Sequence, residues 1–205
     1  KTDYNDNISQ FFNKKKELPG LVFIIVEGLN NDFLNNYNNL GIELMPFMSS
    51  LADSSLYWKN CFCTGERSFA AVPSITASLP HAETGYSLMK KRQNFLSIIN
   101  LLKKYDYHTS FFYGQGAWFH QKHRFLRRSG IDQIFDKSSF PADYEKVIDS
   151  ASNFFWGYND SLLFKFASEK INKFNKPNLF QLYFTGSTHS PFYISNFETY
   201  KKDLY

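Results

Sequence analysis

A glutamate, a serine and a histidine in this chain each follow a sequence pattern that is typical of a reactive position. Glu27 ends the apolar run LVFIIV, Ser68 follows a turn that contains Gly65, and His189 follows the apolar run NLFQLYFT. Open α/β sheets bind their ligands at the carboxyl ends of such buried strands. We therefore expect these three side chains to converge on one edge of a sheet.

Ser68 opens a predicted helix over residues 68–78. Its hydroxyl would face the positive end of the helix dipole and unpaired backbone N–H groups. Those groups favour an alkoxide and then a phosphorylated serine, and a divalent cation held by Glu27 would lower the pKa of the hydroxyl further. The alternatives are an ordinary N-cap for Ser68, the commonest role of serine at a helix start, and a surface residue that ends a strand for Glu27.

Further polar residues could serve the same edge. His120 lies near the start of a helix predicted over 118–128, and Arg67 adjoins the serine. An imidazole can donate to a phosphate oxygen or bind a metal, and a guanidinium can neutralise a phosphate. The alternatives are a solvated loop histidine for His189 and an ordinary exposed arginine for Arg67. His108 lies inside a predicted strand, so we expect it to be structural.

The elements that must position these residues alternate between strands and helices. Strands are predicted at 21–26, 55–63, 107–113 and 178–185, and a short strand or extended piece at 131–135. Helices are predicted at 45–53, 68–78, 95–105, 118–128 and 160–174, and a surface excursion at 137–155. The alternation predicts an α/β fold, a mostly parallel central sheet with helices on both faces.

Particular residues set the details of these elements. The 21–26 run is apolar on both faces, which is typical of a central, fully buried strand. Pro73 fits within the first turn of the helix predicted at 68–78. Gly130 closes the helix predicted at 118–128. Asp160 or Ser161 is expected to cap the following long helix.

Length, charge and cysteine content narrow the class of protein. The 205 residues suit one α/β domain with a real core. The net charge of +4 is spread along the chain, which does not indicate nucleic acid but suits an anionic substrate or a membrane surface. Cys61 and Cys63 are too few for a zinc site, and we expect packed or partly buried thiols. No run has the length of a membrane helix, and no Walker, GxGxxG, HExxH or GxSxG motif occurs.

Seven short segments, in order along nearly the whole chain, carry a family resemblance. They are 23–29 (FIIVEGL), 45–52 (MPFMSSLA), 65–68 (GERS), 78–80 with 85–87 (SLP, GYS), 111–114 with 119–121 (FFYG, FHQ), 155–157 with Asp160 (FWG) and 185–192 (TGSTHSPF). Together they resemble the alkaline-phosphatase superfamily, in the sulfatase-like branch that contains lipoteichoic acid synthases and related phosphoglycerol and phosphoethanolamine transferases. The resemblance implies an alkaline-phosphatase-like fold. It divides the chain into a linker or docking segment, 1–19, and the N-terminal part of a sulfatase-like catalytic domain, 20–205.

The resemblance also implies an enzyme, a metal-dependent transferase or hydrolase of a phospho-headgroup such as phosphoglycerol or phosphoethanolamine. Glu27 and Ser68 would be ligands of a divalent metal, Mn or Zn. Ser68 would also be the nucleophile that forms a covalent phospho-enzyme intermediate. The implied substrate-binding residues are His189, His120, Gln121, Arg67 and Trp156.

The implied partners are a phospholipid headgroup and an acceptor glycan or glycolipid of the cell envelope, and no nucleic acid. The implied location is extracytoplasmic, periplasmic or extracellular, in a protein anchored to the membrane by segments outside this chain. The Asp-His pair that completes the metal site in the family does not follow His189, so we expect a chain truncated at its C-terminus.

Three other functions remain open at this point. They are a catalytically inactive phosphate- or glycan-binding relative, a phosphodiesterase and a sulfatase. The sulfatase is disfavoured because residues 68–72 (SFAAV) lack the C/S-x-P-x-R context of the sulfatase nucleophile.

Overall fold

The computed structural model describes residues 17–65, 67–79, 95–149, 151–190 and 192 of the chain. Most of the predicted linker 1–19 lies outside the described residues, as does the resemblance segment 85–87. Within the part that is described, no helix is both long enough and apolar enough to cross a membrane.

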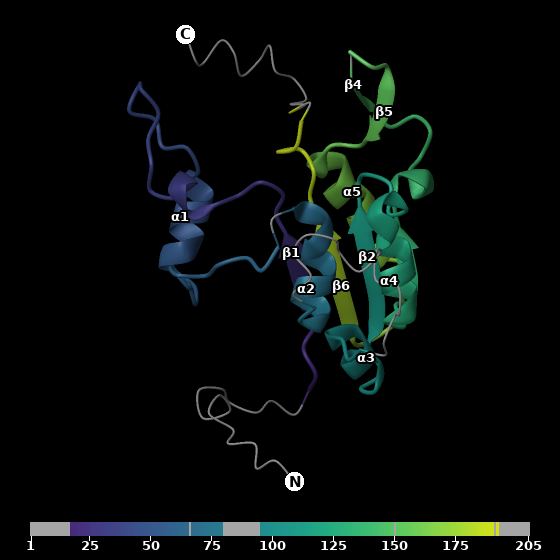
Figure 1. Cartoon of the computed structure of the whole chain (residues 1–205). Coiled ribbons are helices and arrows are strands. Elements are labelled where there is room, and N and C mark those ends of the chain that lie inside the picture. Colours follow the sequence, from purple (N-terminus) through teal and green to yellow (C-terminus); the bar gives the residue numbers. More distant parts are fainter. Residues whose placement is uncertain (1–16, 66, 80–94, 150, 191, 193–205) are drawn as a thin grey trace.

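Four parallel strands form the main sheet (Figure 1). Their order is β1 (Leu21–Ile25), β6 (Leu179–Phe184), β2 (His108–Tyr113) and β3 (Gln133–Phe135). Phe184 at the end of β6 is in register with both Ile25 and Tyr113. The carboxyl ends of three strands therefore lie side by side, and the mostly parallel sheet that the sequence predicts is confirmed.

Helices cover both faces of this sheet. The helices are α1 (Pro46–Asp53), α2 (Ala71–Ala77), α3 (Ile98–Lys103), α4 (Lys122–Arg128) and α5 (Asp160–Ile171), and short 3-10 turns lie at Asn31–Phe33, Ser68–Ala70, Phe119–Gln121 and Lys137–Ser139. A separate antiparallel pair is formed by β4 (Val147–Asp149) and β5 (Phe154–Gly157). The helix α1 lies apart from the other helices, beyond β1 (Figure 1).

Aromatic side chains fill the core on each side of the sheet. Phe111 packs with residues of α2, α3 and α4 on one face, and Phe112 packs with residues of α5 on the other. Neighbouring residues of a strand point to opposite faces, so the Phe111–Phe112 pair serves both layers. Each fully buried phenylalanine contributes about 1.5–3 kcal/mol to the stability of the fold.

The interpretation of residues 21–26 as a central, fully buried strand is wrong for the described sheet. β1 is an edge strand there, and Val22 and Ile24 are 55% and 51% exposed. Phe23 points the other way and packs against the core. An apolar residue on an open sheet face gives the same sequence pattern as a buried one, so the pattern could not distinguish the two positions.

Residues 55–63 form no strand, contrary to the prediction. The apolar side chains of this segment face solvent, with Phe62 86% exposed, and Cys61 and Cys63 are exposed rather than packed. Alternating apolar residues form a strand only where a neighbouring strand supplies hydrogen bonds, and none of the described strands lies beside this segment.

The predicted helix over 118–128 is broken near its start. His120 and Gln121 have left-handed backbone angles, with φ of 49° and 56°, and α4 begins only at Lys122. The apolar spacing continues through the break, which is why periodicity did not reveal it. Gly130, with φ of 82°, ends the helix as expected.

Two further elements differ in detail from the prediction. Residues 137–155 are not only a surface excursion, because Phe140 lies in the core beside α5 and β4 starts within them. The N-cap of α5 is Asn159, whose side chain accepts from Leu162 N, and not Asp160 or Ser161. Pro73 lies in the first turn of α2, as expected.

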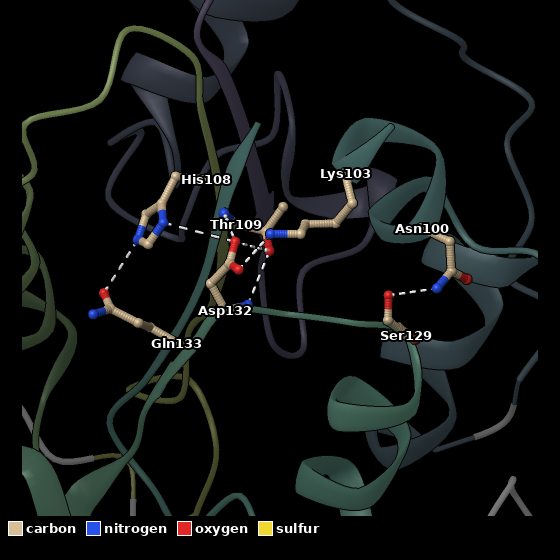
Figure 2. A network of polar contacts seen from close by, with 7 residues as sticks. All are labelled: Asn100, Lys103, His108, Thr109, Ser129, Asp132 and Gln133. Atoms are coloured by element: carbon tan, nitrogen blue, oxygen red, sulfur yellow. Dashed lines mark hydrogen bonds and ion pairs between the residues drawn. The ribbon is translucent and has the colours of Figure 1, made fainter. Parts of the chain in front are cut away.

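A polar network joins the start of β2 to the segment before β3 (Figure 2). It lies at the opposite end of β2 from Tyr113. Asp132 Oδ2 accepts from Thr109 N at 2.8 Å and from Thr109 Oγ1 at 3.0 Å, and Oδ1 pairs with Lys103. His108 Nδ1 lies 3.7 Å from Asp132 Oδ2, in agreement with its expected structural role. Burial opposes ionisation of Asp132, but the hydrogen bonds from Lys103 and Thr109 outweigh it and hold the pKa of this carboxyl below its ordinary value.

We expect Asp132→Asn to destabilise the protein by about 1–3 kcal/mol at pH 7, because the charge-assisted hydrogen bonds are lost. A carboxyl whose pKa is depressed in the folded state stabilises above its unfolded pKa of about 3.9 and loses this contribution as the pH falls. The difference in unfolding free energy between the unchanged protein and Asp132→Asn, measured by urea unfolding, should therefore shrink below about pH 4. The exposed Asp53→Asn at the end of α1 is the control. The same difference in unfolding free energy below about pH 4 as at pH 7 would contradict the prediction.

Candidate active site

A cavity of about 520 Å³ opens at the carboxyl end of the parallel strands. Its lining includes Glu27 after β1, Tyr113 at the end of β2 and His189 after β6. Ser68 and Trp156 reach it from outside the sheet. This is the edge at which the sequence predicted that Glu27, Ser68 and His189 would meet.

Glu27 and Ser68 are in direct contact in this cavity. Ser68 Oγ donates to Glu27 Oε1 at 2.5 Å, although the residues are 41 positions apart in the chain. Arg67 occupies the N-cap position of the 3-10 turn that Ser68 opens. The hydroxyl of Ser68 is thus bonded to the carboxylate and does not act as an ordinary N-cap.

Two threonine hydroxyls that follow β6 hold the backbone of Glu27 in place. Glu27 N donates to Thr185 Oγ1 at 2.9 Å, and Thr185 N donates to Ile25 O at 3.0 Å. Thr188 Oγ1 donates to Glu27 O on the other side of the residue. The position of the carboxylate therefore depends on the strand that also carries His189.

His189 lies against the indole of Trp156. The two rings stack with centroids 4.9 Å apart. His189 Nδ1 lies 2.8 Å from Ser190 O, so Nδ1 carries the proton in this contact. The other nitrogen, Nε2, can accept in the neutral ring and can donate to an anion only in the imidazolium form.

His120 lines the same cavity, next to the segment that carries the serine. Its ring stacks on Phe69, the residue after Ser68, with centroids 4.1 Å apart. Burial lowers the pKa of His120, and the charges of Lys122 and Arg67 lower it further. The imidazole is therefore held toward its neutral form near neutral pH.

Gln121 does not face the cavity, unlike the other predicted substrate contacts. Its Oε1 accepts from Arg124 Nη1 at 3.1 Å on the surface of α4. Arg67, His120, Trp156 and His189 all line the cavity. The left-handed turn at His120 and Gln121 separates the two side chains, and no residue pattern indicates that turn.

Lys122 is a buried cation of this cavity that sequence reasoning missed. Its side chain is only 3% exposed, and Nζ donates to Phe119 O at 3.0 Å. Burial lowers the pKa of Lys122 to about 8, against the opposite pull of Glu27. The sequence does contain a sign that Lys122 is buried. Lys122 stands three and four residues before Phe125 and Leu126, which places it on the apolar face of the helix.

Two buried polar atoms of the cavity wall have no hydrogen-bond partner among the described residues, Gln115 Oε1 and Trp156 Nε1. Gln115 packs directly against the backbone of the β6 loop, since a Cβ on Gly186 would lie 2.1 Å from Gln115 Nε2. Only glycine allows this close approach. No sequence pattern indicates a role for Gln115.

Asp160, at the first position of α5, holds the loop that carries His189. Its Oδ1 accepts from Gly186 N at 2.8 Å and its Oδ2 from Ser187 N at 3.0 Å, while Asp160 N donates to Ser187 Oγ at 2.8 Å. The residue that the sequence suggested as a helix cap therefore bonds to the loop after β6 instead.

The donor atoms present fit part of a divalent-metal site. Glu27 and Ser68 offer two hard oxygen atoms at one point, a type of ligand that Mn²⁺ and Zn²⁺ accept. Among the described residues, no group of three or more His, Cys, Asp or Glu is arranged to hold a metal. The described part of the chain thus supplies two of the ligands that such a site needs.

The family model for Sulfatase matches residues 19–204 of this chain. A protein of the alkaline phosphatase superfamily from Vibrio parahaemolyticus is 27% identical with a TM-score of 0.72, covering 89% of this chain and 44% of its own.

Two other solved structures share the fold. The lipoteichoic acid synthase LtaP from Listeria monocytogenes is 22% identical with a TM-score of 0.70, over 86% of this chain and 42% of that one. The C-terminal periplasmic domain of EcEptC from Escherichia coli, solved in complex with Zn, is 13% identical with a TM-score of 0.60, over 91% and 49%. This chain spans less than half the length of each of the three structures.

Asp160→Ala should free the backbone N–H groups of Gly186 and Ser187. Hydrogen bonds to a charged acceptor contribute about 1.5–3 kcal/mol each, so we expect amide exchange at these two residues to accelerate about 10- to 100-fold. Hydrogen exchange measured by NMR or mass spectrometry tests this, with Glu169→Ala in the same helix as the control. Asp160→Asn, which retains one acceptor oxygen, should be intermediate. Unchanged exchange in Asp160→Ala would show that the carboxylate does not hold the loop.

Proposed function

Because this chain belongs to the sulfatase family of the alkaline phosphatase superfamily, we propose that it carries the nucleophile of an enzyme that transfers or hydrolyses a phospho-headgroup. The observation that supports this most directly is the contact of Ser68 Oγ with Glu27 Oε1 in the cavity at the carboxyl edge of the sheet. A serine that only capped a helix would not need a carboxylate 41 residues away.

The proposed reaction has two steps. Ser68 Oγ forms a bond to phosphorus, its proton passes to Glu27 Oε1 or to water, and the bond from phosphorus to the diacylglycerol oxygen breaks. That oxygen takes up the same proton, from Glu27 or through water, and leaves as diacylglycerol. In the second step an acceptor hydroxyl, or water, forms a bond to phosphorus while the bond from phosphorus to Ser68 Oγ breaks, and the proton of the acceptor passes to Ser68 Oγ.

A divalent metal at Glu27 and Ser68, when bound, would favour the ionised serine and stabilise charge on the phosphoryl oxygens. Metal dependence is general in the superfamily, and one neighbour was solved with Zn. Two oxygen ligands do not select between Mn and Zn, because both metals accept oxygen ligands.

The cations around the serine support binding of an anion. Lys122 and Arg67 bring positive charge to the cavity, and His189 can donate from Nε2 in its imidazolium form. His120, held toward its neutral form, can accept from or donate to a substrate hydroxyl. The Trp156 ring holds the His189 ring by stacking.

The proposed setting is the outer face of a membrane. The donor would be a phospholipid headgroup and the acceptor a glycan or glycolipid of the cell envelope. The support is the fold shared with LtaP, a lipoteichoic acid synthase, and with a periplasmic domain of EcEptC.

Ser68→Ala should abolish turnover while the fold remains intact. Removal of a catalytic nucleophile lowers kcat by about 10³- to 10⁶-fold. Release of diacylglycerol from phospholipid vesicles by the full-length protein, together with the mass of a phosphorylated species trapped by acid, gives the measurement. Ser50→Ala on the exposed side of α1 is the control.

Full activity of Ser68→Ala on phospholipid would refute the proposal. A matched assay with a sulfate ester distinguishes the sulfatase alternative, which requires turnover of that ester and not of phospholipid.

Glu27→Gln should weaken binding of Mn²⁺ and Zn²⁺ by about tenfold or more, because a neutral amide replaces an anionic oxygen ligand. Calorimetric titration of the full-length protein with each ion measures the affinity. Glu17→Gln, exposed and before β1, is the control. Equal affinities in Glu27→Gln and the unchanged protein would exclude Glu27 as a ligand and would favour the inactive binding relative.

A further inference from the structure

Positive charge predominates in the described wall of the cavity. Arg67, Lys122 and Lys137 line it, and Glu27 is the one carboxylate among the described lining residues. Glu27 is already in contact with Ser68 Oγ. A ligand that brings its own ammonium group would therefore meet like charges at close range, whereas a phosphate would meet attractive ones.

The aromatic rings of the wall already face positive or imidazole groups of the protein. Lys137 Nζ lies 5.0 Å from the Phe154 ring centre, and Lys122 Nζ lies 5.1 Å from that of Phe119 and 5.2 Å from that of Tyr113. Each of these lysines also donates to a backbone carbonyl, Lys137 Nζ to Phe155 O at 2.8 Å and Lys122 Nζ to Phe119 O at 3.0 Å. A ligand ammonium would compete with these lysines for cation–π contacts.

Imidazoles occupy two more rings, because His189 stacks on Trp156 and His120 stacks on Phe69. Phe184 is buried. Trp118 is the remaining exposed ring of the described lining and is 57% exposed. An exposed ring is the setting in which cation–π attraction is weakest.

Hydroxyl groups fit the polar atoms that the wall leaves without partners. Trp156 Nε1 can only donate and Gln115 Oε1 can only accept. A hydroxyl group both accepts and donates, whereas an ammonium group only donates. Both residues also line an adjoining cavity of about 10 Å³, about the space of one water.

We propose that this cavity selects a donor whose headgroup is an uncharged polyol, such as phosphoglycerol, and disfavours one that carries an ammonium, such as phosphoethanolamine. This inference rests on the proposed function, because it assigns the headgroup of the same donor. Selection comes from repulsion of the wrong ligand as much as from contacts with the right one.

Binding of two soluble probes tests the selection without any turnover. Glycerol 1-phosphate and O-phosphoethanolamine carry the same phosphate group and differ in the group under test. We expect the full-length protein at pH 7 to bind glycerol 1-phosphate about tenfold or more tightly in calorimetric titration, since like-charge contacts strongly disfavour the wrong ligand. Equal affinities, tighter binding of O-phosphoethanolamine, or binding of neither probe would overturn the proposal.

Lys137→Gln should reduce the preference for glycerol 1-phosphate over O-phosphoethanolamine. The main effect should be tighter binding of O-phosphoethanolamine, because the substitution removes one repulsive charge and frees the Phe154 ring. Lys165→Gln is the matched control, since Lys165 also lies over an aromatic ring, 5.2 Å from that of Tyr144, but does not line the cavity. The same preference in Lys137→Gln as in the control would count against the charge argument.

Turnover separates this inference from the proposed function. Selective binding of glycerol 1-phosphate without diacylglycerol release from phosphatidylglycerol vesicles would refute the transferase and leave the selection intact. Turnover of phosphatidylethanolamine at a rate equal to or above that of phosphatidylglycerol would refute the selection and leave the transferase intact.

Discussion

Hydrogen bonds between β6 and its two parallel neighbours set the geometry of the whole candidate site. Phe184 is paired with Ile25 on one side and with Tyr113 on the other, and Thr185 continues the strand by bonding to Ile25 O and Glu27 N. Since the backbone of a paired strand is rigid, side chains at these three strand ends cannot drift apart. Ser68 and Trp156 come from other elements and complete the cavity around this frame.

Burial shifts the pKa values of two ionisable groups of the cavity, Lys122 and Tyr113. The pKa of Lys122 falls to about 8, so burial acts on it more strongly than the attraction of Glu27 does. Burial, and then the charge of Glu27, raises the pKa of the Tyr113 hydroxyl, which keeps the proton on Tyr113. Perturbed groups of this kind, gathered in one cavity, are more typical of a functional site than of a structural ion pair. The Asp132 network at the other end of the sheet shows the contrast, because each of its charges has a direct partner (Figure 2).

Strand and helix patterns in the sequence predicted the main sheet and most of its helices. They also placed Glu27, Ser68 and His189 at one edge, since each residue adjoins an element boundary that the pattern marks clearly. The errors have physical causes. Val22 and Ile24 are apolar but exposed, residues 55–63 alternate without a described partner strand, and the turn at His120 and Gln121 uses backbone angles that no residue type there announces.

The sequence by itself determined the order of the elements and the chemical types of the residues at their ends. It also determined the family to which the chain belongs, because short motifs in a constant order do not depend on three-dimensional contacts. Only the tertiary structure decided that Ser68 bonds to Glu27, that Asp160 holds the His189 loop, that Gln121 faces away and that Lys122 faces the cavity. Those outcomes depend on contacts between residues far apart in the chain, and local patterns carry no information about such contacts.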